Sequence, residues 1–246
     1  MSANPVVIIQ ARMGSTRLPG KTMMEIAGRR LIDWVLDGAR AIKNARGIIV
    51  AIPENPEDDP LEAYLNERGV SCFRGSSEDV LDRFYRAALE AKADPVIRLC
   101  ADSPLPSAEY MDMMIETHLK TGADHTHNDG LFPLGSYGEV VSFTTLERMW
   151  REAKTVHCRE HVTPFIHENP QSFRVNRVQA PAWMQRDYRL TIDTAKDREM
   201  METLFRAMMD QGLPVNFTNA MAVLEARPEI AAINSTVPQK DWRKGE

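Results

Sequence analysis

Residues 6–21 read VVIIQARMGSTRLPGK, an apolar run followed by a basic segment that contains two glycines. The run at 6–9 consists only of Val and Ile, which predicts a strand buried on both faces within a parallel sheet. The segment that follows holds a proline and three cations and offers almost nothing to a core. We therefore expect a functional loop directly after the first strand.

This basic loop has the composition of a phosphate-binding site. Gly14 lets the main chain approach a ligand closely, and successive backbone N–H groups in such a loop can form a concave anion site. Arg12 and Arg17 can bind phosphate oxygens through two N–H groups each, and Lys21 adds a compact charge. The loop matches neither a Walker A motif nor a dinucleotide-binding G-x-G-x-x-G. A solvated basic loop is the alternative interpretation, and the buried strand directly before the cations favours phosphate binding.

The next hundred residues alternate between strand and helix patterns. Apolar runs predict further strands at 47–52, 70–73 and 96–100. Apolar residues at helical spacing predict helices at 31–42, 60–67, 77–89 and 107–121, with Ser107 as one cap and Ser76 with Asp79 as a capping box of another. This alternation indicates an α/β fold, with a parallel sheet covered by helices on both faces.

The second half of the chain is less regular. A strand is expected at 139–143, a helix at 146–153 capped by Thr144 or Thr145, and a helix at 159–167 that Pro164 disturbs. Residues 172–179 fit one strand of a projecting hairpin, and 189–193 fit a strand that returns to the sheet. Thr194 is expected to cap a methionine-rich helix that runs to residue 210.

Two carboxylates follow predicted strands. Asp102 comes directly after the strand at 96–100 and Asp193 ends the segment at 189–193. Because ligands of such sheets bind beyond the carboxyl ends of the strands, both acids are expected at the edge that carries the basic loop. Opposite a triphosphate they could hold Mg²⁺, which takes one or two carboxylates plus phosphate oxygens. Taken singly, each acid could instead be a loop residue or a helix cap.

Composition narrows the class of protein. The chain has 246 residues, 43% of them hydrophobic, and a net charge of −5. It is long enough for one large domain, and its acidic balance argues against general attraction to nucleic acid or an anionic membrane. The three cysteines show no disulfide spacing, and neither a leader nor a membrane-spanning run is apparent, so we expect a cytoplasmic protein.

The segment 10–21 resembles the signature loop of the cytidylyltransferases that make CMP-sugars, which include the acylneuraminate and Kdo synthetases. The wording QARMGST is most similar to the branch named after spore-coat polysaccharide biosynthesis. The resemblance runs from residue 6 to about 199. It implies a three-layer αβα, Rossmann-like nucleotidyltransferase of the nucleotide-diphospho-sugar transferase type, with a mostly parallel sheet. One domain would span 1–246, with a projecting acceptor and dimer region at about 130–180.

The resemblance also implies an activity. A homodimer would join CTP to a sugar acid of the nonulosonic or octulosonic type, giving a CMP-sugar and pyrophosphate for a surface polysaccharide or glycan. Mg²⁺ would be held by Asp102 and Asp193, and these two acids would act in catalysis with Arg12 and Lys21. The triphosphate would be bound by the loop residues Ala11, Arg12, Met13, Gly14, Ser15, Arg17 and Lys21.

Further positions follow from the same resemblance. Arg74 and Ser76 would lie by the nucleoside base, while Glu139, Arg159 and His161 would face the sugar or the partner subunit. The family often has a Pro and a Glu where residues 195 and 196 are Ala and Lys, and aspartates where Leu134 and Tyr137 stand. The first departure places a cation near Asp193, and the second touches the acceptor pocket.

Other interpretations stay open at this point. The protein could be a nucleotidyltransferase of the same fold that uses another NTP, a glycosyltransferase that uses a ready-made nucleotide sugar, or a nucleotide-binding protein without catalytic activity. His157 and His161 have the spacing of a helical zinc pair. The missing Glu after His157 and the nearby Pro164 disfavour that site.

Overall fold

The computed structural model of the chain describes residues 3–15 and 17–239. Its centre is a seven-stranded sheet in the order β5-β4-β1-β6-β8-β7-β9. The strands β5, β4, β1 and β6 are parallel, β8 is antiparallel to both β6 and β7, and β9 is parallel to β7. The strand bounds are β1 Val6–Gln10, β4 Gly47–Pro53, β5 Ser71–Gly75, β6 Val96–Cys100, β7 His125–Asp129, β8 Glu139–Val141 and β9 Val175–Gln179.

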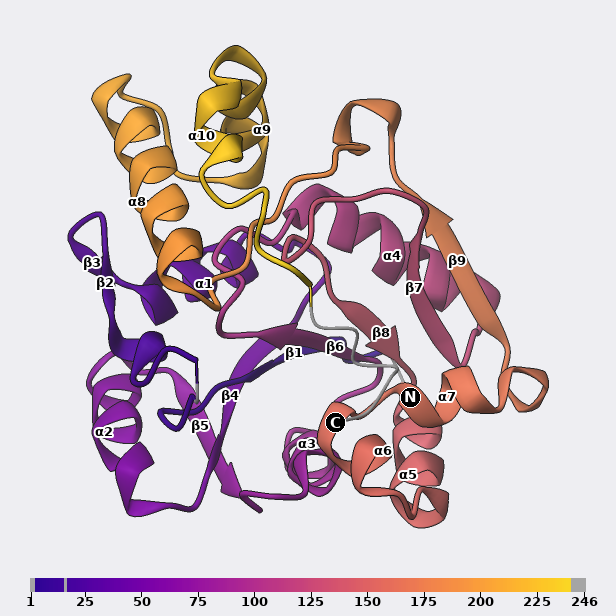
Figure 1. Cartoon of the computed structure of the whole chain (residues 1–246). Helices are drawn as coiled ribbons and strands as arrows, with labels where there is room; N and C mark the ends of the chain where they lie inside the picture. The colour runs from indigo at the N-terminus through magenta and orange to yellow at the C-terminus, as the bar shows by residue number, and fades with distance from the viewer. Residues whose placement is uncertain (1–2, 16, 240–246) are drawn as a thin grey trace.

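Helices cover both faces of this sheet (Figure 1). One face packs against α1 (Leu31–Arg40), α2 (Asp59–Glu67), α4 (Ala108–Thr121), α8 (Ala195–Asp210) and α9 (Phe217–Ala226). The other face packs against α3 (Val80–Glu90), α5 (Phe143–Glu152), α6 (Val156–His161) and α7 (Pro164–Glu168). The smaller elements are β2 Glu25–Ile26, β3 Arg29–Arg30, α10 Pro228–Ala232 and the 3₁₀ turns η1 Lys21–Met23, η2 Pro56–Asp58, η3 Pro170–Ser172 and η4 Ala182–Met184.

The fold is therefore the predicted three-layer αβα architecture with a mostly parallel sheet. The central strand explains why the sequence was informative: Val7, Ile8 and Ile9 have no exposed surface, and successive side chains enter the two opposite cores. Ser107 caps α4, and Thr194 caps α8 through a capping box with Asp197, as predicted. Among the described residues, no helix combines the length and apolar character needed to cross a membrane.

Several local expectations were wrong in the second half of the chain. The strand within 172–179 is β9, which extends the main sheet beside β7 rather than forming a hairpin. Residues 189–193 form no strand; a single bridge joins Arg189 to Leu134. The strand β7 was missed because its sequence, HTHND, has no apolar residue.

Helix boundaries needed smaller corrections. Ser142 caps α5 in place of Thr144 or Thr145. Asp79 caps α3 by accepting from the amide of Asp82, whereas Ser76 accepts from the amide of Asp79 before the helix begins. The expected helix over 159–167 is split at Val162, whose φ of 72° lies in a region that β-branched residues rarely adopt.

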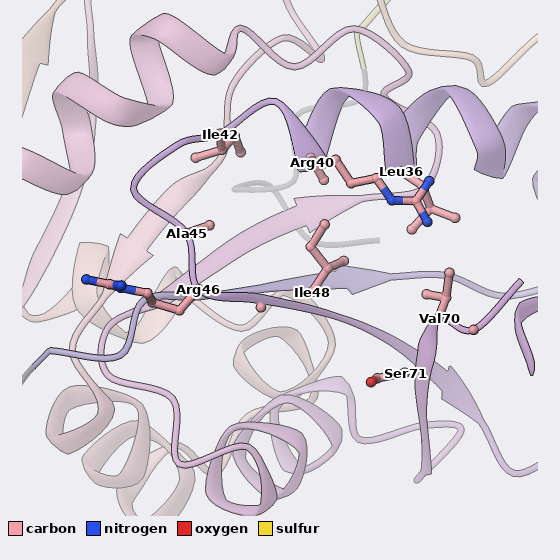
Figure 2. Close-up of a pocket in the computed structure, with 11 residues that line it drawn as sticks. Leu36, Arg40, Ile42, Ala45, Arg46, Ile48, Val70 and Ser71 are labelled. Atoms are coloured by element: carbon pink, nitrogen blue, oxygen red, sulfur yellow. The ribbon is translucent and has the colours of Figure 1, made fainter.

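The pocket drawn in Figure 2 lies at the amino ends of β4 and β5, where Arg46, Ile48 and Ser71 line a hollow of about 310 Å³ with residues of α1. The basic loop leaves the carboxyl end of β1, which is the opposite edge of the sheet. Because open α/β sheets bind ligands beyond the carboxyl ends of their strands, a functional site is expected at that edge rather than at this pocket.

Candidate active site

Lys21, Asp102 and Asp193 meet at one point. The Lys21 Nζ atom lies 3.0 Å from Oδ2 of Asp102 and 2.9 Å from Oδ1 of Asp193. It also donates to the carbonyl oxygen of Ile192 at 2.9 Å. The structure thus brings together the end of the basic loop and both acids that the sequence placed near it.

Backbone contacts fix this arrangement. The carbonyl oxygen of Asp102, in the loop after β6, accepts a hydrogen bond from the amide of Ile192 at 2.8 Å and one from the Thr191 hydroxyl at 3.2 Å. On the other side, the turn η1 begins at Lys21 and carries its side chain toward both acids. The carboxylates are therefore held by rigid neighbours before any ligand binds.

Charge keeps Lys21 protonated in this position. Burial by itself would lower the pKa of Lys21, but the charges and hydrogen bonds of Asp102 and Asp193 outweigh it and raise that pKa. The ammonium group therefore stays positive at neutral pH. A fixed positive charge in a half-buried place suits a site that receives anionic oxygens.

Asp193 is supported from behind by a second set of groups. Arg189 donates to Oδ2 of Asp193 and to Oδ1 of Asp197, both at 2.8 Å. The fully buried Asp197 also accepts from the amide of Asp193 at 3.1 Å and from Asn234 at 2.9 Å. Burial would raise the pKa of Asp197, yet these donors hold it below its usual value. Arg189, Asp197 and Asn234 therefore position Asp193, a role that the sequence analysis did not assign to them.

The cation that the sequence places beside Asp193 points elsewhere. The exposed Lys196 donates to the hydroxyl of Thr236 at 3.2 Å. Arg17, and not Lys196, pairs with Asp193: the Arg17 guanidinium lies 2.9 Å from Oδ1 of Asp193. Replacement of the family's Glu by Lys196 thus leaves the carboxylate of Asp193 accessible to the loop.

The basic loop itself is anchored at several points. The Met13 amide donates to the buried carboxylate of Asp58 at 2.7 Å, and the Thr22 hydroxyl donates to the Arg12 carbonyl at 2.8 Å. A methyl group added at Gly14 would lie 2.5 Å from Oε1 of Glu57, so the turn η2 packs closely on the loop. Further loop contacts include Ala11 N to Ala51 O, Ser15 N and Gly20 N to Met13 O, Lys21 N to Leu18 O and Leu18 N to Ser15 Oγ; Thr16 lies outside the described residues.

Arg12 and Arg83 form a second basic feature beside the loop. Arg83 is 1% exposed, and burial and the nearby charge of Arg12 lower its pKa to about 10. One of its nitrogens donates to the Ser76 carbonyl at 2.5 Å, while the buried Nε has no partner among the described residues. Two neighbouring guanidinium groups repel one another, and a bound anion would offset this repulsion. Arg83 lies within the helix predicted at 77–89 and received no role from the sequence, and only its burial distinguishes it.

Arg74 is already engaged by protein groups. Its guanidinium lies 2.6 Å from Asp59 and 2.7 Å from Glu62, and it donates to the Asn55 carbonyl at 2.8 Å. Ser76 accepts from the Asp79 amide at 3.0 Å. The structure thus places Ser76 beside Arg83, and ties Arg74 to the start of α2 instead of bringing it to the meeting point of the acids.

The three residues expected near the acceptor bind different partners. Glu139 is bound by Arg98 at 3.1 Å and by Thr163 at 3.0 Å. Arg159 pairs with Asp79 and donates to the Trp150 carbonyl at 2.6 Å, so it joins α6 to α3 and α5. The ring of His161 packs against His157, with centroids 5.0 Å apart.

A comparison with known proteins now identifies the family. Residues 6–227 match the model of the cytidylyltransferase family. The chain belongs to the cytidylyltransferase family. This match spans the loop, both acids and all of α9, whereas Asn234, behind Asp193, lies beyond it.

Individual cytidylyltransferase relatives agree with this assignment. The spore coat polysaccharide biosynthesis protein SpsF of Bacillus subtilis is 36% identical over 91% of this chain and 95% of its own. The 3-deoxy-manno-octulosonate cytidylyltransferase of Bdellovibrio bacteriovorus is 27% identical over 65% of this chain and 61% of its own. The structure of a cytidylyltransferase from Leptospira borgpetersenii superposes with a TM-score of 0.87 at 28% identity, covering 97% of this chain and all of that one.

The donor set of this cytidylyltransferase fits a divalent cation. Asp102 and Asp193 both bind the same nitrogen of Lys21, so oxygens of the two carboxylates converge on one position. Carboxylate oxygens are the ligands that Mg²⁺ prefers, and it takes phosphate oxygens and water for the remaining positions. A bound triphosphate would draw Lys21 and Arg17 onto its own oxygens and leave these carboxylates for the ion.

Proposed function

We propose that this cytidylyltransferase uses CTP to activate a sugar acid of the nonulosonic or octulosonic type, giving a CMP-sugar and pyrophosphate for a surface polysaccharide or glycan. The observation that carries the proposal is the meeting of Lys21 with Asp102 and Asp193 at the end of the basic loop. Family membership supports the use of CTP, and the names of the two relatives support a sugar acid and a polysaccharide product.

Nucleotide binding would fall to the loop. Arg12, Arg17 and Lys21 would hold the β- and γ-phosphates, because guanidinium and ammonium groups form charge-assisted hydrogen bonds with phosphate oxygens. Ser76 and the buried Arg83 would lie toward the nucleoside. Arg74 would take part in base recognition only if its bonds to Asp59 and Glu62 were exchanged on binding.

The reaction is an in-line displacement at the α-phosphorus. The anomeric hydroxyl oxygen of the sugar acid forms a bond to that phosphorus, the bond to the bridging oxygen of the β-phosphate breaks, and pyrophosphate leaves. The hydroxyl proton passes to solvent or a nearby base. Little covalent chemistry falls to the protein, so positioning and charge neutralisation provide the acceleration. Lys21 and the two loop arginines would stabilise the charge that develops on the leaving pyrophosphate.

Asp102 and Asp193 would hold Mg²⁺, with Arg189 keeping Asp193 in place. When bound, the ion supplies Lewis-acid polarisation of the α-phosphate and favours ionisation of the attacking hydroxyl. Glu139 is proposed on the acceptor side of the site. Arg159 and His161, on α6, are proposed near the sugar or the partner subunit of a homodimer.

The test is a CTP-dependent release of pyrophosphate with a panel of nonulosonic and octulosonic acids, with products analysed by mass spectrometry. We expect one acid to give a CMP-sugar together with an equal amount of pyrophosphate. A protein that bound CTP but formed no adduct with any acid would overturn the proposed acceptor class. Stronger thermal protection by GTP, ATP or UTP than by CTP would overturn the nucleotide.

A further inference from the structure

Three of the six histidines of the chain gather around one carboxylate. His125 and His127 come from β7, His167 comes from α7, and Glu139 comes from β8. The ring centroids of the three histidines lie 5.2 to 5.6 Å apart. None of these histidines has a role in the proposed reaction, so their convergence calls for its own explanation.

The distances within this group suit one metal ion. Nε2 of His125 lies 3.2 Å from Oε1 of Glu139, and Nε2 of His167 lies 3.9 Å from the same oxygen. One ligand atom from each residue falls within 4.8 Å of the other two. Ligand atoms around a tetrahedral zinc ion lie about 3.3 Å apart, given metal–ligand bonds of about 2.0–2.2 Å. The His125–Glu139 pair already has this separation. The side chain of His167 is 33% exposed, so a small rotation could shorten its distance to Glu139 to the same value.

Glu139 is held in the orientation that a metal ligand needs. Its Oε2 atom accepts from Arg98 at 3.1 Å and from the Thr163 hydroxyl at 3.0 Å, which leaves Oε1 turned to the histidines. Arg98 and Thr163 therefore fix Oε2 and do not compete for Oε1.

The break between α6 and α7 serves this arrangement. Val162 has a φ of 72°, and the chain reverses there before α7 begins at Pro164. A β-branched residue is strained in this conformation. The turn places Thr163 against Oε2 of Glu139 and His167 near Oε1.

We propose that His125, Glu139 and His167 bind one divalent transition-metal ion of the zinc class. Two imidazoles and one carboxylate favour zinc and its neighbours, whereas Mg²⁺ prefers oxygen ligands alone. Three protein ligands leave a further position for water or an anion, as in zinc sites that act on bound molecules. His127 lies beside the group, and its Nδ1 contacts the Asn128 carbonyl at 2.7 Å, which leaves Nε2 as the nitrogen with a lone pair.

This site is separate from the one at Asp102 and Asp193, because the two share no ligand. Glu139 is also proposed on the acceptor side of the reaction site, so a metal that it holds would lie on that side. The metal proposal itself does not depend on CTP or on a sugar acid.

The chain contains a matched control. His157 and His161 are also neighbouring histidines, with ring centroids 5.0 Å apart on α6. Within the part of the chain that the structure describes, the only group of three or more metal-ligand side chains that meets the distance criterion is the one at Glu139. His157 therefore provides a histidine whose loss should not affect the proposed site.

The experiment uses the full chain without a histidine tag, freed of metal by a chelator and titrated with Zn²⁺ and Co²⁺ in excess Mg²⁺. We expect one equivalent of Zn²⁺ and a visible Co²⁺ absorption for the unaltered protein and for His157→Ala and Asp102→Asn. His167→Ala should weaken zinc binding at least tenfold, and His167→Cys should restore it. No uptake by the unaltered protein, or equal affinity in His167→Ala, would overturn the proposal. Circular dichroism of each variant checks that the fold is retained.

Discussion

Nζ of Lys21 lies 2.9 Å from Oδ1 of Asp193, although 172 positions separate the two residues in the chain. The contact joins the first loop of the fold to the segment that precedes α8. Asp102, just after strand β6, binds the same nitrogen at 3.0 Å.

Lys21→Ala should lower turnover with CTP by about a hundredfold or more, because a fixed charge that meets a leaving group contributes that much in other enzymes. The fold should survive, since the side chain is partly exposed. Pyrophosphate release measures the effect. Lys196→Ala is the matched control: it removes the same charge from an exposed side chain that contacts Thr236. Near-full activity in Lys21→Ala would contradict the mechanism.

Asp102→Asn should lower turnover by a comparable factor and raise the Mg²⁺ concentration needed for half-maximal activity, since an amide oxygen is a weaker ligand than a carboxylate. Activity measured across a Mg²⁺ series separates this effect from loss of CTP binding. The exposed Asp210 at the end of α8 provides the control Asp210→Asn. An unchanged Mg²⁺ requirement in Asp102→Asn would remove this acid from the proposed metal site.

Asp197→Ala should destabilise the protein by about 3–5 kcal/mol, because it removes a fully buried carboxylate that accepts from Arg189, Asn234 and the Asp193 amide. The same change removes the capping box of α8. Urea denaturation gives the free energy of unfolding. Glu229→Ala removes an exposed partner of Arg227 and should change the free energy of unfolding by less than about 1 kcal/mol. Similar stabilities for the two variants would show that the support behind Asp193 is weak.

His118 should make stability depend on pH between about 4 and 6.5. Burial, with a smaller contribution from the charge of His125, lowers the pKa of His118 from 6.5 to about 4, so its neutral form belongs to the folded state. The contribution of neutral His118 to the free energy of unfolding is fully present above pH 6.5. It is lost as the pH falls through the pKa that His118 has in the folded protein, by an amount on the order of 3 kcal/mol. The free energy of unfolding, measured across this range, should fall less steeply with decreasing pH in His118→Gln. Parallel curves for the two proteins would contradict the assignment.

The parallel part of the fold was predictable because its strands are buried on both faces. Residues 6–9, 48–52 and 96–99 are nearly all apolar, and each run ends at a loop whose residues cannot pack in a core. The positions of Lys21 and Asp102 at one edge of the sheet followed from this topology. The strand β7 could not be found in this way, because polar residues fill it and its histidines serve contacts with Glu139.

The other features of the site could not be predicted, because they depend on long-range contacts that local sequence patterns do not encode. Asp193 was expected at the end of a strand, yet it is placed by a bridge from Arg189 to Leu134 and by the bond from Ile192 to Asp102. Arg83 stands in an ordinary amphipathic helix, and its burial becomes apparent only when β5 packs beside it. In the same way, the sequence drew attention to His157 and His161, whereas the chain folds two other histidines, His125 and His167, around Glu139.

A crystal structure of the protein with CTP and Mg²⁺ tests the central claim most directly. The account predicts that the triphosphate lies along the basic loop, with Lys21 and Arg17 on its oxygens and the ion between Asp102 and Asp193. A nucleotide bound at another edge of the sheet, with Lys21 still joined to both acids, would contradict it.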